Sequence, residues 1–170
     1  DAPPPLTLLW ITPLRALAGD TGLALARAAA ALAPHWAIDV RTGDTGPAAR
    51  ARQGKRLPTA LVTTPESLTL FLARADWRER FAHLGAIVVN EWHELMGTKR
   101  GVQTELALAR LRALCPGLVT WGLSATIGNL DEAARALVGR DGDPQVITSP
   151  GAKALVVETL IPADMERFPW

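Results

Sequence analysis

Short apolar runs alternate along this chain with stretches of helical periodicity, and no other feature limits the possible folds as strongly. Five of the runs have the length and the bulky apolar residues of buried strands. We expect these strands at residues 6–11, 37–42, 60–63, 86–90 and 118–123. Because strands separated by helices pair in a mostly parallel sheet with helices on both faces, the sequence predicts an α/β fold.

The helices expected between these strands carry recognisable start signals. Pro65 suits the first turn of a helix because its missing N–H would have no partner there, and Glu66 complements the positive end of the helix dipole. Asn129 and Glu132 have the spacing of a capping box. We expect helices at residues 14–33, 47–57, 65–73, 77–81, 102–114 and 129–138, a loop through 96–101, and two final strands near 145–148 and 155–160.

Polar residues stand directly after each of the five strands. Ligands bind at the carboxyl ends of the strands in sheets of this kind. A helix cap would explain the polar residues after any single strand. Polar residues after all five strands, at one edge of the sheet, favour a binding site. The five segments are Thr12–Pro13, Thr42–Thr45, Thr64–Ser67, Asn90–His93 and Ser124–Thr126.

The bulk composition indicates one compact domain, with 170 residues of which 48% are hydrophobic and 21% charged. No uncharged apolar run reaches the length of a membrane span, so we expect a cytoplasmic protein without a membrane partner. The formal net charge of +1 gives no overall attraction to nucleic acid. Binding would therefore depend on local basic clusters at residues 50–56 and at Lys99–Arg100. The single cysteine, Cys115, leaves no internal disulfide and is expected to be a small buried residue at a helix end.

The segment at 90–93 contains residue types that suit phosphoryl chemistry, in which one carboxylate holds Mg²⁺ and its neighbour orients the attacking water. Only Glu91 is a carboxylate in this pair, since Asn90 offers a neutral oxygen. His93 has no second histidine at helical spacing, which argues against zinc. No Gly-x-x-x-x-Gly-Lys-Ser/Thr loop occurs in these 170 residues, so the usual backbone cradle for a triphosphate is missing from the sequence.

The order and spacing of the strand-exit motifs resemble the superfamily-2 helicases, most closely the large helicase-related group with its ligase-associated DEXH-box branch. Six motifs in the same order make the resemblance specific, although each one alone is weak. They are ITPLRAL (11–17, like motif Ia), RTGDT (41–45), TTPESL (63–68, like motif Ib), NEWHEL (90–95, where the family has Asp-Glu-x-His), KRGVQ (99–103) and GLSATIGN (122–129, like motif III).

The resemblance implies that residues 1–170 are a partial first RecA-like domain of an ATP-dependent DNA helicase, covering motifs Ia to III, without a second domain. The fold would lack the first strand and helix, which carry the phosphate loop. ATP and Mg²⁺ would serve the parent protein, and this fragment alone is expected to bind neither and not to hydrolyse ATP. The run at 118–123 would then be an unpaired edge of the sheet.

The resemblance also assigns roles to single residues. Glu91 would orient the hydrolytic water, Asn90 would occupy the magnesium and nucleotide position in a weakened form, and His93 would couple nucleotide state to the second motor domain. Ser124 and Thr126 would link hydrolysis to movement. The residues that would contact the sugar–phosphate backbone are Pro13, Arg15, Thr42, Gly43, Asp44, Thr45, Thr64, Pro65, Glu66 and Ser67.

The partners implied by the resemblance are single-stranded or partly duplex DNA, the second RecA-like domain of the parent, and DNA ligase and nuclease partners in repair, with 3′ to 5′ movement. Two alternatives remain open: a non-catalytic nucleic-acid or protein interaction module, and a small-molecule α/β binding protein, for which no dinucleotide fingerprint is present. The tryptophans at 10, 36, 77, 92 and 121 are expected to pack in or near the core rather than to stack on bases.

Overall fold

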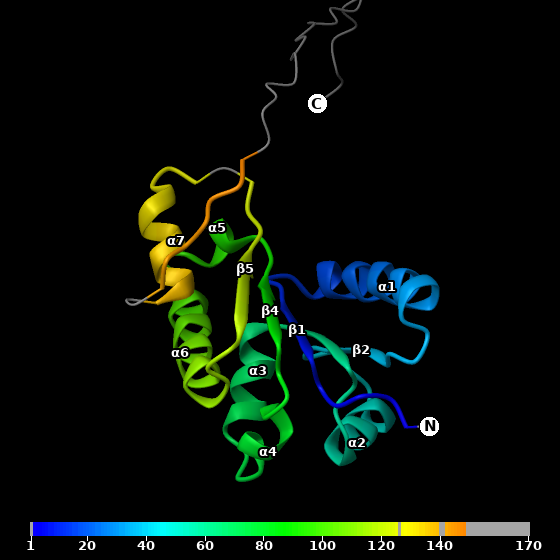
Figure 1. The fold of residues 1–170 in the computed structure, drawn as a ribbon. Helices are drawn as coiled ribbons and strands as arrows, with labels where there is room; N and C mark the ends of the chain where they lie inside the picture. The colour runs from blue at the N-terminus through cyan, green and yellow to red at the C-terminus, as the bar shows by residue number, and fades with distance from the viewer. Residues whose placement is uncertain (1, 126, 140–141, 149–170) are drawn as a thin grey trace, which may run out of the picture.

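The computed structural model describes residues 2–125, 127–139 and 142–148. Five parallel strands in this part of the chain form one sheet in the order β2-β3-β1-β4-β5 (Figure 1). The predicted α/β fold with a parallel sheet is therefore confirmed. The strands are β1 (Leu8–Ile11), β2 (Ile38–Arg41), β3 (Ala60–Thr63), β4 (Ala86–Val89) and β5 (Val119–Gly122).

Helices cover the sheet from two sides, with α1 on the right of the strands and α6 and α7 on the left in Figure 1. The first helix packs against β2 and β3, while α6 lies between α3 and α7 in the other layer. The helices are α1 (Arg15–Leu32), α2 (Pro47–Lys55), α3 (Pro65–Leu72), α4 (Trp77–Phe81), α5 (Trp92–Leu95), α6 (Lys99–Leu114) and α7 (Leu130–Val138).

The main hydrophobic core lies on the side of the sheet that α3 and α6 cover. Leu9 and Ile11 of β1 and Ile87 and Val89 of β4 point into it, since alternate residues of these strands are buried. The other side is packed more thinly, because α1 buries only Ala18 and Gly22. A side chain at Gly22 would meet the Val40 methyl group at 2.5 Å, so this glycine permits the close approach of α1 to β2.

Two predicted boundaries near β4 were wrong. Residues Trp92–Leu95, for which no helix was predicted, form the four-residue helix α5, and α6 begins at Lys99, inside the expected loop and three residues before the predicted start. Thr98 caps α6, with its hydroxyl accepting a hydrogen bond from the Gly101 N–H at 3.1 Å. Gly101 was expected in the loop, but it allows the first turn of α6 to pack on the Leu95 carbonyl, which a Cβ would approach to 2.1 Å.

Four further predictions concern the second half of the chain. The predicted cap of α7 by Asn129 is confirmed, since Asn129 Oδ1 accepts a hydrogen bond from the Glu132 N–H at 3.3 Å, while the Glu132 carboxylate accepts from the Asn129 side-chain amide at 2.8 Å rather than from its backbone N–H. Cys115 is buried at the end of α6, as predicted. The strand predicted at 145–148 is wrong, because these residues have no regular structure and pair with no strand of the described sheet. The strand predicted at 155–160 lies outside the described residues.

The strand β5 forms an edge of the described sheet and pairs only with β4, as predicted. Trp121 and Val119 on this strand are each 53% exposed. The prediction that every tryptophan packs in or near the core was therefore wrong for Trp121, because no described element covers its face of the edge strand. Among the described residues, no helix has both the length and the apolar character needed to cross a membrane.

Candidate functional site at the carboxyl edge of the sheet

The predicted site residues lie along one edge of the sheet in the order of the strands. Because all five strands are parallel, their carboxyl ends meet at the same edge. We divide this edge into the β2-β3-β1 half, which contains Thr42–Thr45, Thr64–Ser67, Pro13 and Arg15, and the β4-β5 half, which contains Asn90–His93 and Ser124. Thr126 was also predicted for the site and lies outside the described residues.

The loop after β2 is held in shape by its own hydroxyl groups and by one arginine. The Thr42 N–H donates to Thr45 Oγ1 at 2.9 Å, and the Asp44 N–H donates to Thr42 Oγ1 at 3.2 Å. Arg50 of α2 donates to the carbonyl oxygens of Gly43 and Thr45, each at 2.6 Å. These contacts hold the loop in one conformation. Arg50 takes part in them through backbone carbonyl oxygens rather than through an ion pair with a carboxylate.

Arg15, which was predicted to bind phosphate, forms an ion pair with Asp44. Its Nη1 donates to Asp44 Oδ1 at 2.8 Å, and the two side chains are 63% and 68% exposed. A guanidinium has five N–H donors, so a single hydrogen bond to Asp44 orients the group and leaves donors for a second anion. The structure brings both residues together at the exit of β2, as the motifs predicted, and adds the pairing between them.

The first turn of α3 follows β3 and is almost covered. Thr64 and Ser67 are 3% and 6% exposed, and the Thr64 hydroxyl lies 3.5 Å from that of Ser67. The Thr63 hydroxyl donates to the Arg41 carbonyl at 2.8 Å, which ties this exit to β2. The exposed member of the turn is Glu66, whose side chain is 51% exposed.

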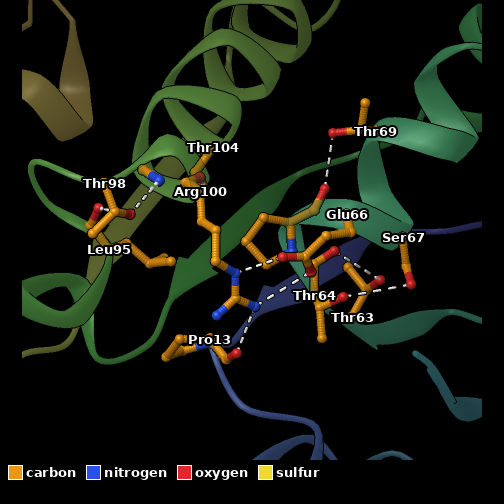
Figure 2. A network of polar contacts seen from close by, with 12 residues as sticks. Pro13, Thr63, Thr64, Glu66, Ser67, Thr69, Leu95, Thr98, Arg100 and Thr104 are labelled. Carbon is orange, nitrogen blue, oxygen red and sulfur yellow. Dashed lines mark hydrogen bonds and ion pairs between the residues drawn. The ribbon is translucent and has the colours of Figure 1, made fainter. Parts of the chain in front are cut away.

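Arg100 was not among the predicted site residues, yet it joins three segments of this edge (Figure 2). From the first turn of α6, its Nε donates to Glu66 Oε1 at 2.5 Å. Its Nη2 donates to the Pro13 carbonyl at 2.6 Å and to Glu66 Oε2 at 3.3 Å. The sequence signals for this residue were its place in the KRGVQ motif and in the basic pair Lys99–Arg100, and neither indicated its partners, because the contacts connect positions 87 and 34 residues apart.

The charge of Glu66 is stabilised by these contacts. Burial raises the pKa of the Glu66 carboxyl, but hydrogen bonds from the Arg100 guanidinium and the Glu66 backbone N–H, together with the Arg100 charge, hold the pKa below its usual range. The carboxylate is therefore ionised at neutral pH and is matched by a fixed positive charge.

A hollow of about 210 Å³ lies beside Ser67, between α2 and α3, and three arginines line it. Burial, together with the charges of Arg50 and Arg74, lowers the pKa of Arg41. None of the lining residues is a carboxylate. Arg74 is paired with Asp76 at 2.9 Å, just outside the lining, so the positive field of the hollow comes mainly from Arg41 and Arg50. Arg50 belongs to the basic run predicted at 50–56, of which Arg52 is paired with Asp39 at 2.7 Å.

The β4-β5 half is built around a sharp turn at Glu91. This residue has φ 50° and ψ 48°, in the left-handed region, and it caps the short helix α5. The Trp92 N–H donates to the Leu123 carbonyl at 3.0 Å, and the Leu123 N–H donates to the Val89 carbonyl at 2.9 Å. The turn is thus fixed between the ends of β4 and β5, with the Glu91 side chain 38% exposed.

His93 and Ser124 meet across this turn. His93 Nδ1 lies 2.9 Å from Ser124 Oγ and 3.5 Å from Glu91 Oε2, while its Nε2 lies 3.5 Å from Glu94 Oε1. The motif after β4 is therefore joined to the motif after β5 by a side-chain contact.

Trp92 anchors this half in the core. Its side chain is 2% exposed, and its Nε1 donates to the Ala133 carbonyl of α7 at 3.0 Å. This contact fixes α5 against α7, so the short helix that presents His93 does not depend on its own few hydrogen bonds.

The donor set at the exit of β4 fits a resident magnesium ion poorly. Asn90 supplies a neutral oxygen where a carboxylate would supply charge, and Glu91 is the one carboxylate of the pair. Across the described residues, no group of three or more histidine, cysteine, aspartate or glutamate side chains is placed to hold a metal ion. A metal ion here would need further ligands from a nucleotide.

Comparison with known proteins decides which family this arrangement represents. The family model for DEAD/DEAH box helicases matches residues 2–133. The chain belongs to the DEAD/DEAH box helicase family.

Members of this family that resemble the chain include helicases named Lhr. The ATP-dependent helicase Lhr-Core of Methanothermobacter thermautotrophicus is 33% identical over 169 residues, covering 92% of this chain and 20% of that protein. The Lhr helicase/probable uracil glycosylase of Mycolicibacterium smegmatis is 35% identical over 166 residues, covering 91% of this chain and 11% of that protein. The chain thus spans about a fifth or less of the length of these relatives.

Solved helicase structures share the fold. The Mycobacterium smegmatis helicase Lhr bound to ssDNA and AMP-PNP superposes with a TM-score of 0.78 and 36% identity, over 89% of this chain and 21% of that one. The DUF1998 helicase MrfA bound to DNA and AMPPNP gives a TM-score of 0.66 and 26% identity, over 78% of this chain and 19% of that one. The predicted resemblance to the large helicase-related group and the predicted RecA-like fold are both confirmed. The roles of single site residues in this helicase domain stay predictions.

Proposed function

We propose that this chain is the first RecA-like motor domain of an ATP-dependent DNA helicase or translocase, with residues 1–170 contributing motifs Ia to III. The observation that carries the proposal is the 2.9 Å contact between His93 and Ser124, which joins the two motifs that a motor uses to connect nucleotide and movement. The relatives named as ATP-dependent helicases, and the similar structures that contain DNA, support it.

In the β4-β5 half, Glu91 would orient the water that attacks the γ-phosphate of ATP, because its carboxylate is partly exposed and lies on a fixed turn. His93 would report the nucleotide state to Ser124 and Thr126 and to a second RecA-like domain. Asn90 would occupy the position of the magnesium ligand with reduced strength. Mg²⁺ would supply charge neutralisation on the phosphates when it is bound with ATP.

In the β2-β3-β1 half, the tracked strand would be held by its sugar–phosphate backbone. Arg15 with its orienting Asp44 and the loop from Thr42 to Thr45 lie at one edge with the first turn of α3, whose Thr64 and Ser67 side chains are almost covered. The arginine-lined hollow beside Ser67 adds a positive field. Contacts of this kind bind phosphates without reading bases, as a translocase requires.

The wider assignments follow from the same proposal. The substrate would be single-stranded or partly duplex DNA, the direction of movement 3′ to 5′, and the process DNA repair, with a DNA ligase and a nuclease as partners. The nucleotide cofactors of the parent protein would be ATP and Mg²⁺.

A second candidate is a non-catalytic nucleic-acid or protein interaction module on a RecA-like scaffold. The amide of Asn90 favours it, because this residue replaces a charged metal ligand with a neutral one. In that case the β2-β3-β1 half would keep its grip on DNA while turnover would be absent.

The test is the ATPase rate of the full-length protein with and without single-stranded DNA. We expect Asn90→Asp to raise the DNA-stimulated rate and Glu91→Gln to lower it by about 100-fold. Glu79→Gln, the same carboxylate-to-amide exchange on α4, serves as the control and leaves the rate unchanged. A rate that Asn90→Asp does not raise contradicts the assignment of the metal position, and DNA binding without turnover in any variant favours the interaction module.

A further inference from the structure

The β2-β3-β1 half contains two carboxylates at the surface proposed to hold a polyanion. Asp44 and Glu66 carry side chains that are 68% and 51% exposed. An unpaired carboxylate repels a phosphate that approaches it, so both groups work against the proposed function unless their charge is matched. Each one is in fact paired with an arginine, at 2.8 Å for Arg15 and 2.5 Å for Arg100.

The two pairs differ in how they are built. Arg15 lies on the element next to its partner loop and makes one hydrogen bond to Asp44. Arg100 comes from α6, in the other helical layer, and contacts both Glu66 oxygens as well as the Pro13 carbonyl (Figure 2). One guanidinium therefore bridges the exit of β1 and the first turn of α3, which are separate phosphate-binding segments in the proposed function.

The backbone that carries Arg100 is held in place by contacts at the start of α6. Thr98 caps α6 through the Gly101 N–H, and its own hydroxyl donates to the Leu95 carbonyl at 2.6 Å. Gly101 packs against that same carbonyl so closely that a Cβ would lie 2.1 Å from the oxygen. The start of α6 is thus locked to the end of α5, and Arg100 has little freedom to leave Glu66.

We propose that Arg100 is a positioning residue for nucleic-acid binding: it neutralises Glu66 and holds the β1 exit and the first turn of α3 together, so that a backbone phosphate can approach this edge. The inference rests on the proposed function and adds a residue and a role that the motif assignment did not contain. Arg100 acts through Glu66 and Pro13 rather than through its own contact with DNA.

This role predicts an unusual pattern of rescue. Arg100→Ala leaves the Glu66 charge unmatched beside the bound strand, whereas Arg100→Ala combined with Glu66→Gln removes both charges. The double variant should therefore bind DNA more tightly than the single arginine variant. A residue that donates directly to phosphate would show no such rescue, because the missing donor is not replaced.

The experiment measures the affinity of the full-length protein for a fluorescently labelled oligothymidylate by anisotropy, over a series of salt concentrations. We expect Arg100→Ala to weaken binding about tenfold at low salt, with a smaller deficit at high salt where repulsion is screened. Adding Glu66→Gln should recover most of this loss, and the gain in affinity from Glu66→Gln should be larger in the Arg100→Ala background than in the wild-type protein, where Arg100 already matches the Glu66 charge. Arg27→Ala, which removes an exposed cation of α1 outside the proposed binding edge, is the matched control and should stay within about twofold.

Arg100→Lys keeps the charge and loses the bidentate geometry, so we expect an intermediate affinity. The folding of each variant is checked by its circular dichroism melting curve. If Arg100→Ala does not fold, Arg100→Lys replaces it in the test. Wild-type affinity in Arg100→Ala, or in Arg100→Lys when it stands in, overturns the inference while the proposed function survives. A double variant as weak as Arg100→Ala also overturns it and indicates direct contact. No binding of single-stranded DNA by the wild-type protein overturns the proposed function, and the inference falls with it.

Discussion

The two halves of the carboxyl edge are built in different ways. The β2-β3-β1 half is a network in which arginines, hydroxyls and carbonyls from several elements hold one another, and Arg100 joins the exits of two strands. The β4-β5 half rests on fewer contacts, with one left-handed turn, one buried tryptophan and one contact between His93 and Ser124. The difference teaches that the proposed strand grip is preorganised by side-chain contacts among several elements, whereas the proposed nucleotide side combines backbone hydrogen bonds at Trp92 and Leu123 with one buried side-chain anchor, that of Trp92.

The largest expected effect comes from removing that anchor. Trp92→Ala should lower the free energy of unfolding by about 3–5 kcal/mol, because it empties a core position and removes the hydrogen bond to the Ala133 carbonyl. Trp121→Ala, on the exposed edge strand, is the matched control and should cost less than about 1 kcal/mol. Urea unfolding of the three proteins measures the difference. Equal losses for the two tryptophans would show that α5 does not depend on Trp92.

A smaller effect is expected at the junction that connects the two halves. Gly101→Ala should lower the free energy of unfolding by about 1–3 kcal/mol, because the new methyl group meets the Leu95 carbonyl and pushes α6 away from α5. The control is Gly54→Ala in α2, where no atom lies within 4 Å of the added Cβ. That substitution should stabilise the protein by up to about 1 kcal/mol through helix propensity. Opposite signs for the two glycines in urea unfolding support the locked junction, and a loss at both sites contradicts it.

The smallest effect should appear in the pH dependence of the β2-β3-β1 half. The pKa of Glu66 is held below its usual range, so its ion pair stabilises the folded state above the unfolded pKa of about 4.3, and this stabilisation is lost as the pH falls through the lower folded value. Because Glu66 is half exposed, the contribution should stay below about 1 kcal/mol.

Glu66→Gln should therefore be less stable than the wild-type protein at pH 7, with the difference shrinking in acid. Urea unfolding at several pH values measures this difference, and Glu79→Gln, on the exposed face of α4, provides the comparison. A deficit of Glu66→Gln that grows as the pH falls would contradict the sign of the pKa shift.

The parts of the fold that the sequence predicted well are those with strong local signals. The helix α4 and the strand β3 have the predicted bounds, and α3 begins at Pro65 as predicted, since proline at the first helical position and a short apolar run both act within a few residues. The short helix α5 and the early start of α6 were missed because they depend on tertiary contacts. Gly101 weakens a helix by propensity, yet close packing on Leu95 requires it.

The candidate site divides in the same manner. The strand exits could be located from the chain alone, because a parallel sheet brings them to one edge wherever the strands stand in the sequence. The ion pairs of Arg15 with Asp44 and of Arg100 with Glu66 could not be predicted from the sequence, because charge pairs across 29 and 34 residues have no local pattern. The exposure of Trp121 was missed for a related reason, since an apolar run predicts a strand but not which of its faces another element covers.

The left-handed turn at Glu91 has a consequence for how this position can vary. Glycine fits such a backbone without strain, while a residue with a Cβ loses about 1–2 kcal/mol there. Replacement by glycine should therefore relieve the backbone strain at this position. If the carboxylate orients water, the same replacement should also be the most damaging one for turnover. Relatives that retain glutamate here would do so because selection for activity outweighs the backbone preference for glycine. Variants that had lost activity would be free to change this position to glycine.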